Sequence, residues 1–165
     1  MGGVSSLDHP GIHKVTTALA EAGFDSAATG VRVLTDAVRT AAQAAAALGV
    51  EVGAIANSLV FTADGAPLLV LTSGAHRADT ALLAELAGVA EVGRATPDFV
   101  REHTGQAIGG VAPVGHPAPI RTFVDRALAD HPEIWAAAGH PKAVFPTTFT
   151  DLVALTGGTP VEVTR

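Results

Sequence analysis

The sequence predicts an α+β domain built around a mixed β-sheet. Segments typical of helices and of strands follow one another irregularly, and a hairpin lies in the middle of the chain. No internal repeat, linker or low-complexity tail interrupts the 165 residues. This order argues against a doubly wound parallel sheet, in which strands and helices alternate regularly. A chain of this length is expected to form a single domain over 1–165.

The N-terminal part is predicted to hold two helices and one strand. Aliphatic residues repeat at helical spacing over 10–22, and Gly23 follows at the expected end. Side chains alternate over 30–34, which favours a short strand. Over 40–49 a threonine followed three residues later by a glutamine forms a capping-box pattern, and the final glycine ends the helix.

The clearest β signal is a hairpin. Two β-rich runs, 52–62 and 67–72, flank the turn-forming pair Asp64 and Gly65. A short leucine-rich helix is expected after Asp79.

The next segment contains a helix with clear boundaries. Thr96 can cap a helix that begins at Pro97, a residue favoured in the first turn, and that ends near Gly105. Residues 120–128 are predicted to form either a strand or a short helix.

The C-terminal part is predicted to contain two strands with a helix between them. The first strand covers 143–145, and the second covers 161–163. Thr148, with an aspartate three residues later, opens the helix, and Gly157 ends it.

The composition excludes several classes of function. The chain has no cysteine, which excludes disulfides, thiolate nucleophiles and cysteine-based zinc sites. A net charge of -6 and a pI of about 5.5 argue against strong autonomous nucleic-acid binding, although a local basic patch is compatible with both. The N-terminus has no signal-peptide pattern, and the apolar runs are shorter than the roughly 20 residues of a membrane span. A cytoplasmic protein is therefore expected.

The most informative segment is 105–117, GQAIGGVAPVGHP. The adjacent Gly109 and Gly110 and the two prolines make a regular helix or strand unfavourable. Most of the other residues are apolar, so we expect a partly buried loop. Such a loop lets a ligand come close to main-chain N–H groups, which indicates a binding site.

Standard catalytic motifs are absent. The seven histidines show no metal-ligand spacing, so neither a metal nor another cofactor is expected. The GxSxG elbow and the phosphate-binding GxxxxGK loop are missing as well. Asn57 and Ser58 are polar residues inside an apolar strand, and one of them must face inward or line a cavity because strand neighbours face opposite sides. A purely structural, hydrogen-bonded asparagine is the alternative.

Several unusual segments, taken together, resemble the YbaK/EbsC family of aminoacyl-tRNA deacylases. This family is related to the editing insertion domain of bacterial prolyl-tRNA synthetases. The segments occur in the family order and cover about residues 36–163. They are RTAAQAAAALG (39–49), VGAIANSLVF (52–61), PLLVLTSGAHRAD (67–79), VGRATPDFVREHTGQAIGGVAPVGH (92–116), IRTFVD (120–125) and WAAAGHPKAVFPTTFTDLVALTG (135–157).

The resemblance implies both a fold and an activity. The expected fold is a mixed sheet curved into a partial barrel, with helices around it. The expected reaction is hydrolysis, in trans, of the ester that joins a small wrong amino acid, such as Cys or Ala, to a proline-type tRNA. The expected partners are the aminoacyl 3′ end of a mischarged tRNA and an aminoacyl-tRNA synthetase. No membrane partner is expected, and the oligomeric state is left open.

The resemblance also implies a site. The GxxxP loop of the family matches residues 109–113, whose main-chain N–H groups would polarise the ester carbonyl. No side chain is an obvious general base, so water or a substrate group would attack while the protein positions and polarises the ester. His116 would contact the amino group or the pocket wall, and a loop histidine bonded to the backbone is the alternative. The expected catalytic residues are Gly109, Gly110 and Asn57, and the expected substrate-binding residues are Ser58, Val111, Ala112, Pro113 and His116.

One position departs from the family pattern. Active members commonly carry a lysine in a strand like IVKSLVF, whereas this chain reads IANSLVF and places Asn57 there. A hydrogen bond to a charged group is worth about 1.5–3 kcal/mol, against about 1 kcal/mol for a neutral one. Weaker substrate binding, a different aminoacyl substrate or loss of deacylation would each follow. The alternative function is a catalytically weak module that binds a tRNA end, a nucleotide or a synthetase without hydrolysis.

Overall fold

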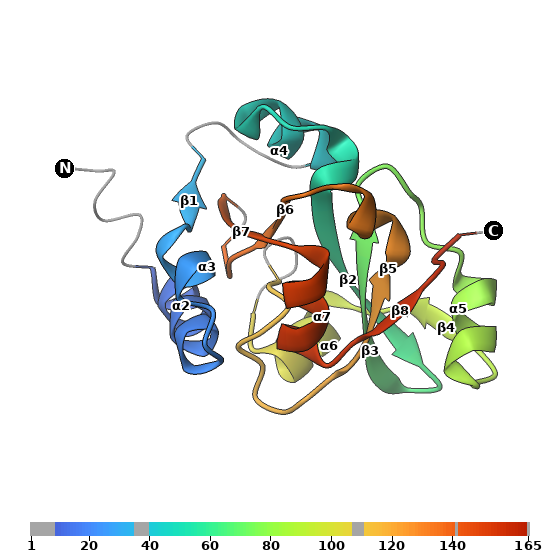
Figure 1. Ribbon diagram of the computed structural model, residues 1–165. Coiled ribbons are helices and arrows are strands. Elements are labelled where there is room, and N and C mark those ends of the chain that lie inside the picture. Colours follow the sequence, from blue (N-terminus) through green and yellow to red (C-terminus); the bar gives the residue numbers. More distant parts are fainter. Residues whose placement is uncertain (1–8, 35–39, 107–110, 141, 165) are drawn as a thin grey trace.

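A computed structural model describes residues 9–34, 40–106, 111–140 and 142–164. One mixed sheet forms its centre (Figure 1). The strands are β1 (Arg32–Val33), β2 (Ile55–Ala63), β3 (Ala66–Ser73), β4 (Val92–Arg94), β5 (Arg121–Asp125), β6 (Ile134–Ala137), β7 (Ala143–Thr147) and β8 (Thr159–Val161). The helices are α2 (Pro10–Glu21), α3 (Asp25–Thr29), α4 (Ala41–Leu48), α5 (Thr80–Ala87), α6 (Pro97–Thr104) and α7 (Phe149–Thr156), with 3-10 turns η1 (Val52–Ala54) and η2 (Arg126–Asp130).

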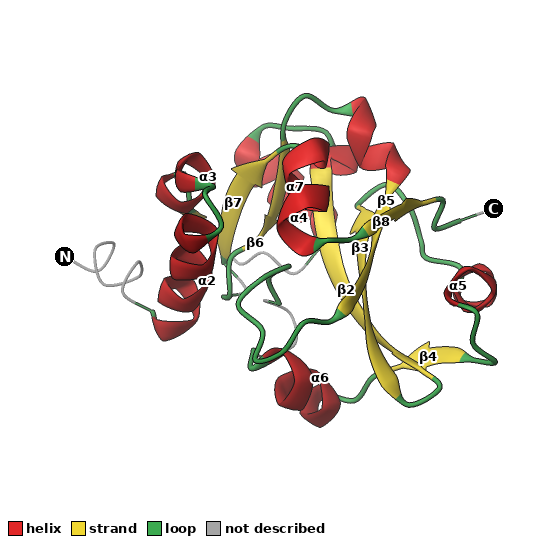
Figure 2. Ribbon diagram, turned by 60° about the horizontal axis from the view of Figure 1, so that its bottom comes forward, coloured by secondary structure: helices red, strands yellow, loops and turns green. Residues whose placement is uncertain are grey.

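The sheet follows the order β1-β7-β6-β2-β3-β5-β8, and β4 pairs with β2 outside that path. The pairs β2–β6, β3–β5 and β5–β8 are parallel, and the other described pairs are antiparallel. The predicted α+β fold with a mixed sheet is therefore confirmed. The long strands β2 and β3 twist strongly and curve the sheet, which is open and does not close into a barrel (Figure 2).

Strand β3 lies inside the sheet, between β2 and β5, and is buried on both faces. Leu68, Leu69, Val70 and Leu71 are all fully buried. Because neighbouring side chains of a strand point to opposite faces, Leu69 and Leu71 join one hydrophobic cluster and Leu68 and Val70 join a second. A continuous apolar run of this kind is what a strand covered on both sides requires.

The hairpin turn and the helix caps follow the sequence prediction closely. Asp64 and Gly65 both have positive φ, +50° and +89°, as a tight two-residue hairpin demands. The hydroxyls of Thr40, Thr96 and Thr148 each accept a hydrogen bond, at 3.1 Å, from the N–H three residues later. These side chains satisfy main-chain donors that would otherwise lack a partner at the helix starts.

Some strand boundaries differ from the prediction. Residues 52–54 form the turn η1, so the first strand of the hairpin begins at Ile55. The last strand covers Thr159–Val161 and not 161–163, because Phe123, Val124 and Asp125 of β5 pair with residues 159–161. The strand expected at 30–34 is reduced to β1, the two residues Arg32 and Val33. Helix α3 and strands β4 and β6 were not predicted, since segments of three to five residues carry too little periodicity.

The helices surround the sheet at its ends and faces. Helices α2 and α3 lie beside β7, while α5 lies near β4 (Figures 1 and 2). Among the described residues, no helix combines the length and the apolarity that crossing a membrane demands.

Candidate functional site

A cavity of about 690 Å³ lies beside the middle of β2. This volume is typical of pockets that bind small molecules. The side chains around it come from β2, β3, the β3–α5 loop, β4, α6 and the segment before β5. The lining residues are Asn57, Ser58, Leu59, Val60, Phe61, Thr72, His76, Arg77, Ala78, Thr80, Arg94, Ala95, Val100 and Val111.

The cavity lies where the sheet is incomplete. On one edge, β3 pairs with β2 from residue 56 to residue 63. On the other edge, β6 pairs only with residues 55–56 and β4 only with residues 61–63. None of the described residues pairs with 57–60 along this edge. Main-chain N–H and C=O groups on an unpaired strand edge can bond to a ligand, as in strand-addition complexes.

Two buried hydroxyls at the cavity have no hydrogen-bond partner among the described residues. Thr72 lies directly across from Asn57 in the β2–β3 register, and Ser58 lies across from Leu71. Within the described part of the chain, neither Ser58 Oγ nor Thr72 Oγ1 has a hydrogen-bond partner, although both atoms are buried. A buried polar group without a partner costs about 1–3 kcal/mol. Because they belong to neighbouring register positions, the Ser58 and Thr72 side chains project from opposite faces of the sheet. Both residues line the cavity, which identifies this part of β2 and β3 as a candidate binding surface.

His76 is held in the cavity wall by a buried carboxylate. Its Nδ1 donates to Asp125 Oδ2 at 2.9 Å, and Asp125 is fully buried while His76 is 31 % exposed. The same carboxylate accepts hydrogen bonds from the main-chain N–H groups of Ser73, at 3.0 Å, and Ala127, at 2.9 Å. Three donors on one buried carboxylate compensate for its loss of hydration. The imidazole is therefore fixed by Nδ1, and its Nε2 has no partner among the described residues.

The loop that carries His76 is fixed at both ends. Gly74 follows β3, and a Cβ at this position would lie 2.4 Å from the carbonyl oxygen of Val52, so only glycine fits. At the other end, Asp79 caps α5 by accepting from the N–H groups of Ala81 and Leu82, at 3.0 and 3.1 Å. The constraints at Gly74 and at Asp79 thus hold the short loop, and with it His76, in place from both ends.

Two arginines line the cavity. Arg77 follows His76, and Arg94 ends β4; both side chains are exposed. Neither forms an ion pair with a described carboxylate. A chain with a net charge of -6 thus places at this cavity two positive charges that have no ion-pair partner among the described residues. Guanidinium groups of this kind bind phosphates by paired hydrogen bonds.

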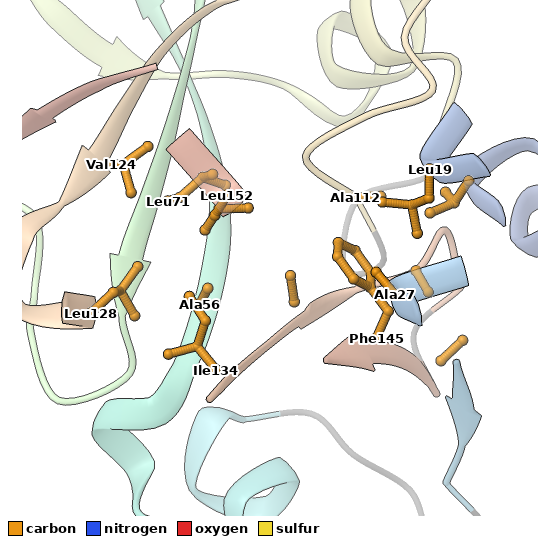
Figure 3. Close-up of a cluster of buried hydrophobic side chains, with 14 of the residues drawn as sticks. Leu19, Ala27, Ala56, Leu71, Ala112, Val124, Leu128, Ile134, Phe145 and Leu152 are labelled. Atoms are coloured by element: carbon orange, nitrogen blue, oxygen red, sulfur yellow. The ribbon is translucent and has the colours of Figure 1, made fainter. Parts of the chain in front are cut away.

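The segment after the glycine pair is held in the core by Gln106. This side chain is 5 % exposed, accepts from Ala112 N at 2.7 Å and donates from Nε2 to Val114 O at 3.0 Å. Ala112 itself lies in a hydrophobic cluster with Leu19 of α2 and Phe145 of β7 (Figure 3). The main-chain N–H of Ala112 is thereby committed within the protein and is not free for a ligand.

His116 bonds to the main chain of the same segment. Its Nε2 donates to the carbonyl oxygen of Ala112 at 2.8 Å. Burial lowers the pKa of the His116 imidazole below its usual 6.5, and the bond to Ala112 opposes this shift only in part. Folding therefore favours the neutral ring. Its hydrogen bond to Ala112 stabilises the turn of the main chain between residues 112 and 116.

The predicted site residues fall into three groups. Asn57, Ser58 and Val111 line one cavity, although they come from segments far apart in the sequence. Ala112 and Pro113 are buried, and with His116 they stand outside the cavity lining. Gly109 and Gly110 lie outside the described residues. In the described part of the chain, no three metal-ligating side chains gather in one place.

Several residues of the site were missed at the sequence level. His76 and Asp125 are 49 positions apart, and no local motif links them. Arg77 and Arg94 lie on different elements, and Gln106 looks like an ordinary loop residue. The only available signal was an aspartate at the end of an apolar strand, IRTFVD, where a buried carboxylate needs donors from elsewhere.

Comparison with known proteins places the chain among editing domains. The family model of the aminoacyl-tRNA editing domain matches residues 35–155. A proline–tRNA ligase of Maridesulfovibrio salexigens is 36% identical over 84 residues, which are 51% of this chain and 13% of that protein. A proline–tRNA ligase of Nitratidesulfovibrio vulgaris strain DP4 is 33% identical over 103 residues, 62% of this chain and 18% of that protein. The chain thus spans less than a fifth of these relatives.

Solved structures resemble the chain over nearly its whole length. A protein described as a candidate trans-editing enzyme for prolyl-tRNA synthetase is 42% identical, with a TM-score of 0.87, and the match covers 95% of this chain and 98% of that one. A scaffold protein from computational epitope grafting is 38% identical, with a TM-score of 0.89, and the match covers 94% and 98% of the two chains.

Removing the Gln106 amide should destabilise the protein. Gln106→Ala leaves the Ala112 N–H and the Val114 carbonyl unpaired in the core, and we expect a loss of about 2 kcal/mol in the free energy of unfolding. Gln106→Met is the matched control, because it keeps the side-chain volume and removes only the hydrogen bonds. Urea unfolding measures both variants. A Met variant as stable as the unmodified protein would show that Gln106 acts by volume alone.

The lowered pKa of His116 makes stability depend on pH. The unfolded chain takes up a proton near pH 6.5, which the folded state resists, so stability is fully present above that pH and declines as the pH falls through the folded pKa. His140, whose pKa is lowered by partial burial and by the nearby His9 and Lys142, adds a decline of the same sign. We expect His116→Gln to lose less stability than the unmodified protein between pH 8 and pH 5 in urea titrations. Parallel pH curves for both proteins would contradict this assignment.

Proposed function

The chain belongs to the aminoacyl-tRNA editing domain family, and we propose that it hydrolyses mischarged aminoacyl-tRNA in trans. The bond cleaved is the ester between a small amino acid, such as Cys or Ala, and the 3′ end of a proline-type tRNA. Two comparisons support this choice. The relatives that it matches are proline–tRNA ligases, and a close structural neighbour carries the description of a candidate trans-editing enzyme for prolyl-tRNA synthetase.

The observation that carries the proposal is the wall formed by Asn57, Ser58, Thr72 and Val111. It combines the side-chain amide of Asn57, two buried hydroxyls that have no partner among the described residues, and Val111, the residue that follows the glycine pair. An aminoacyl ester offers a carbonyl, an amino group and ribose hydroxyls, all within a few ångströms of one another. These groups match the polar atoms of the wall, and no charged side chain is needed to hold them.

The cavity favours a small, apolar acyl group. Away from the polar wall, Leu59, Val60 and Val100 line it, and none of the described lining residues is a carboxylate. A cationic amino-acid side chain would find no counter-charge there, and burying it unpaired would be costly. We therefore assign the aliphatic part of the cavity to the side chain of the wrong amino acid.

The ester carbonyl would lie beside the open edge of β2 and near Val111. Main-chain N–H groups that are already oriented stabilise the negative charge which develops on the carbonyl oxygen during attack. Because the N–H of Ala112 is bonded to Gln106, the donors must come from other residues of 109–113 or from the free edge of β2. Gly109 and Gly110 keep their proposed catalytic role.

Arg77 and Arg94 would hold the phosphates of the tRNA end. Asn57 stands where active relatives commonly carry a lysine, and it cannot supply charge. The two exposed guanidinium groups at the same cavity provide positive charge from the β3–α5 loop and from β4. This arrangement gives the acidic protein a local anion-binding surface.

A second candidate function is binding without hydrolysis. The observation that favours it is Asn57, because its neutral amide binds an anionic ligand less strongly than an ammonium group would. The cavity would then hold a tRNA end or a nucleotide, or the protein would dock on a synthetase.

Deacylation assays separate the two functions. We expect the purified protein to release amino acid from Ala-tRNA or Cys-tRNA of the proline type faster than buffer does, and to spare the correctly charged tRNA. Asn57→Ala should reduce kcat/KM about tenfold, since one hydrogen bond to substrate is worth about 1–1.5 kcal/mol. Turnover at the buffer rate for every mischarged tRNA, with a gain of activity in Asn57→Lys, would support the binding module.

The proposed phosphate contacts predict a change in salt dependence. Arg77→Gln and Arg94→Gln should each weaken tRNA binding and reduce the slope of log affinity against log salt by about 0.7–0.9, the contribution of one phosphate contact. Arg101→Gln is the matched control, because Arg101 is exposed on α6 and does not line the cavity. Binding isotherms between 50 and 200 mM salt measure the slopes. Equal slopes in all four proteins would exclude these arginines as phosphate ligands.

A further inference from the structure

The Asp125–His76 pair is the strongest polar arrangement of the cavity that the proposed ester site does not use. The carboxylate is fully buried, and three donors converge on it, so its position is fixed. Two of those donors are main-chain groups: the Ser73 N–H joins the end of β3 to the end of β5, and the Ala127 N–H belongs to the turn η2 that follows β5. The third donor is the His76 side chain, which takes no part in joining the two strands. The imidazole is therefore held by the carboxylate in a defined orientation at the cavity wall.

We propose that His76 is the catalytic residue that moves the proton during ester hydrolysis, with Asp125 as its positioning residue. This inference rests on the proposed function. With Nδ1 donating to Asp125, the neutral ring carries its free electron pair on Nε2, the nitrogen without a described partner. In other hydrolytic sites, too, a base that activates the nucleophile is itself oriented by a further hydrogen-bonding group. Asp125 would orient His76 in the same manner.

The step balances without any further reagent. A water molecule attacks the ester carbonyl, and Nε2 of His76 takes one of its protons as the new C–O bond forms. When the bond to the tRNA oxygen breaks, Nε2–H returns that proton to the leaving oxygen. The products are the free amino acid and the tRNA hydroxyl, and the imidazole ends neutral. Asp125 stays ionised and stabilises the imidazolium that forms between the two steps.

Few other charged groups face the ring. Arg94 from β4 and Arg77 from the same loop line the same cavity, and among the described lining residues no other side chain titrates. Behind the ring, Ser73 Oγ donates to the Gly53 carbonyl at 2.9 Å, and His131 approaches Gly53 from the segment after η2. His131 in turn lies 3.7 Å from the exposed Glu51. Asp125 is thus the only carboxylate in direct contact with His76 among the described residues.

The pH profile of kcat tests the proposal. For the unmodified protein, kcat should fall as the pH drops below the range in which an imidazole loses its proton, because the protonated ring cannot act as a base. His76→Gln keeps a hydrogen-bonding side chain but cannot titrate. We expect it to lower kcat by about 10²–10⁴-fold, to leave KM nearly unchanged and to abolish the acidic limb of the profile. His103→Gln is the matched control, since His103 also lies near a carboxylate, at 3.1 Å from Glu102, but does not line the cavity.

Chemical rescue distinguishes catalysis from a structural role. Because His76 is 31 % exposed, added imidazole can reach the space that His76→Ala creates. Recovery of turnover with imidazole, following the concentration of its neutral form, would support a proton-transfer role.

A His76→Gln variant with unchanged kcat and pH profile would overturn the inference while the proposed function stands. A decline of activity at high pH in the unmodified protein, lost in His76→Gln, would overturn it in favour of a cationic binding role. Absence of turnover in the unmodified protein would overturn both proposals.

Discussion

The site depends on one electrostatic constraint: a carboxylate buried in the core has to be supplied with hydrogen-bond donors. Asp125 ends β5, and its oxygens accept from Ser73 at the end of β3, from Ala127 at the start of η2 and from His76 in the following loop. An uncompensated charge there would be strongly unfavourable. Satisfying it fixes the relative positions of two parallel strands and of the loop that forms one wall of the cavity.

The second constraint is the break in pairing along β2. Strands β6 and β4 cover its two ends and leave residues 57–60 open among the described residues. Val111, the residue after the glycine pair, lines the cavity at this break, and Gln106 ties the residues that follow it to the core through two hydrogen bonds. A cavity between a free strand edge and a fixed loop can hold an ester largely through main-chain groups.

The positive charge at the cavity comes from arginines outside β2. Strand β2 itself holds the neutral Asn57, and the positive charges lie on Arg77 and Arg94 at the cavity. The polar wall and the charged residues come from different elements. Under the proposed function, the residues that contact the amino acid and those that contact the tRNA end therefore belong to different elements.

The sequence by itself determined the local structure and the family. Threonine caps, the Asp64-Gly65 turn and the apolar run of β3 are local signals, because they depend on neighbouring residues and on the periods of helix and strand. They predicted the long elements and the mixed sheet, and the segment resemblance placed Asn57, Ser58 and Val111 at one site. Only the tertiary structure decided the boundaries of the short strands β1, β4, β6 and β8, which are set by pairing partners. It alone brought His76 to Asp125 across 49 residues, since a contact between distant segments leaves no periodic trace in the chain.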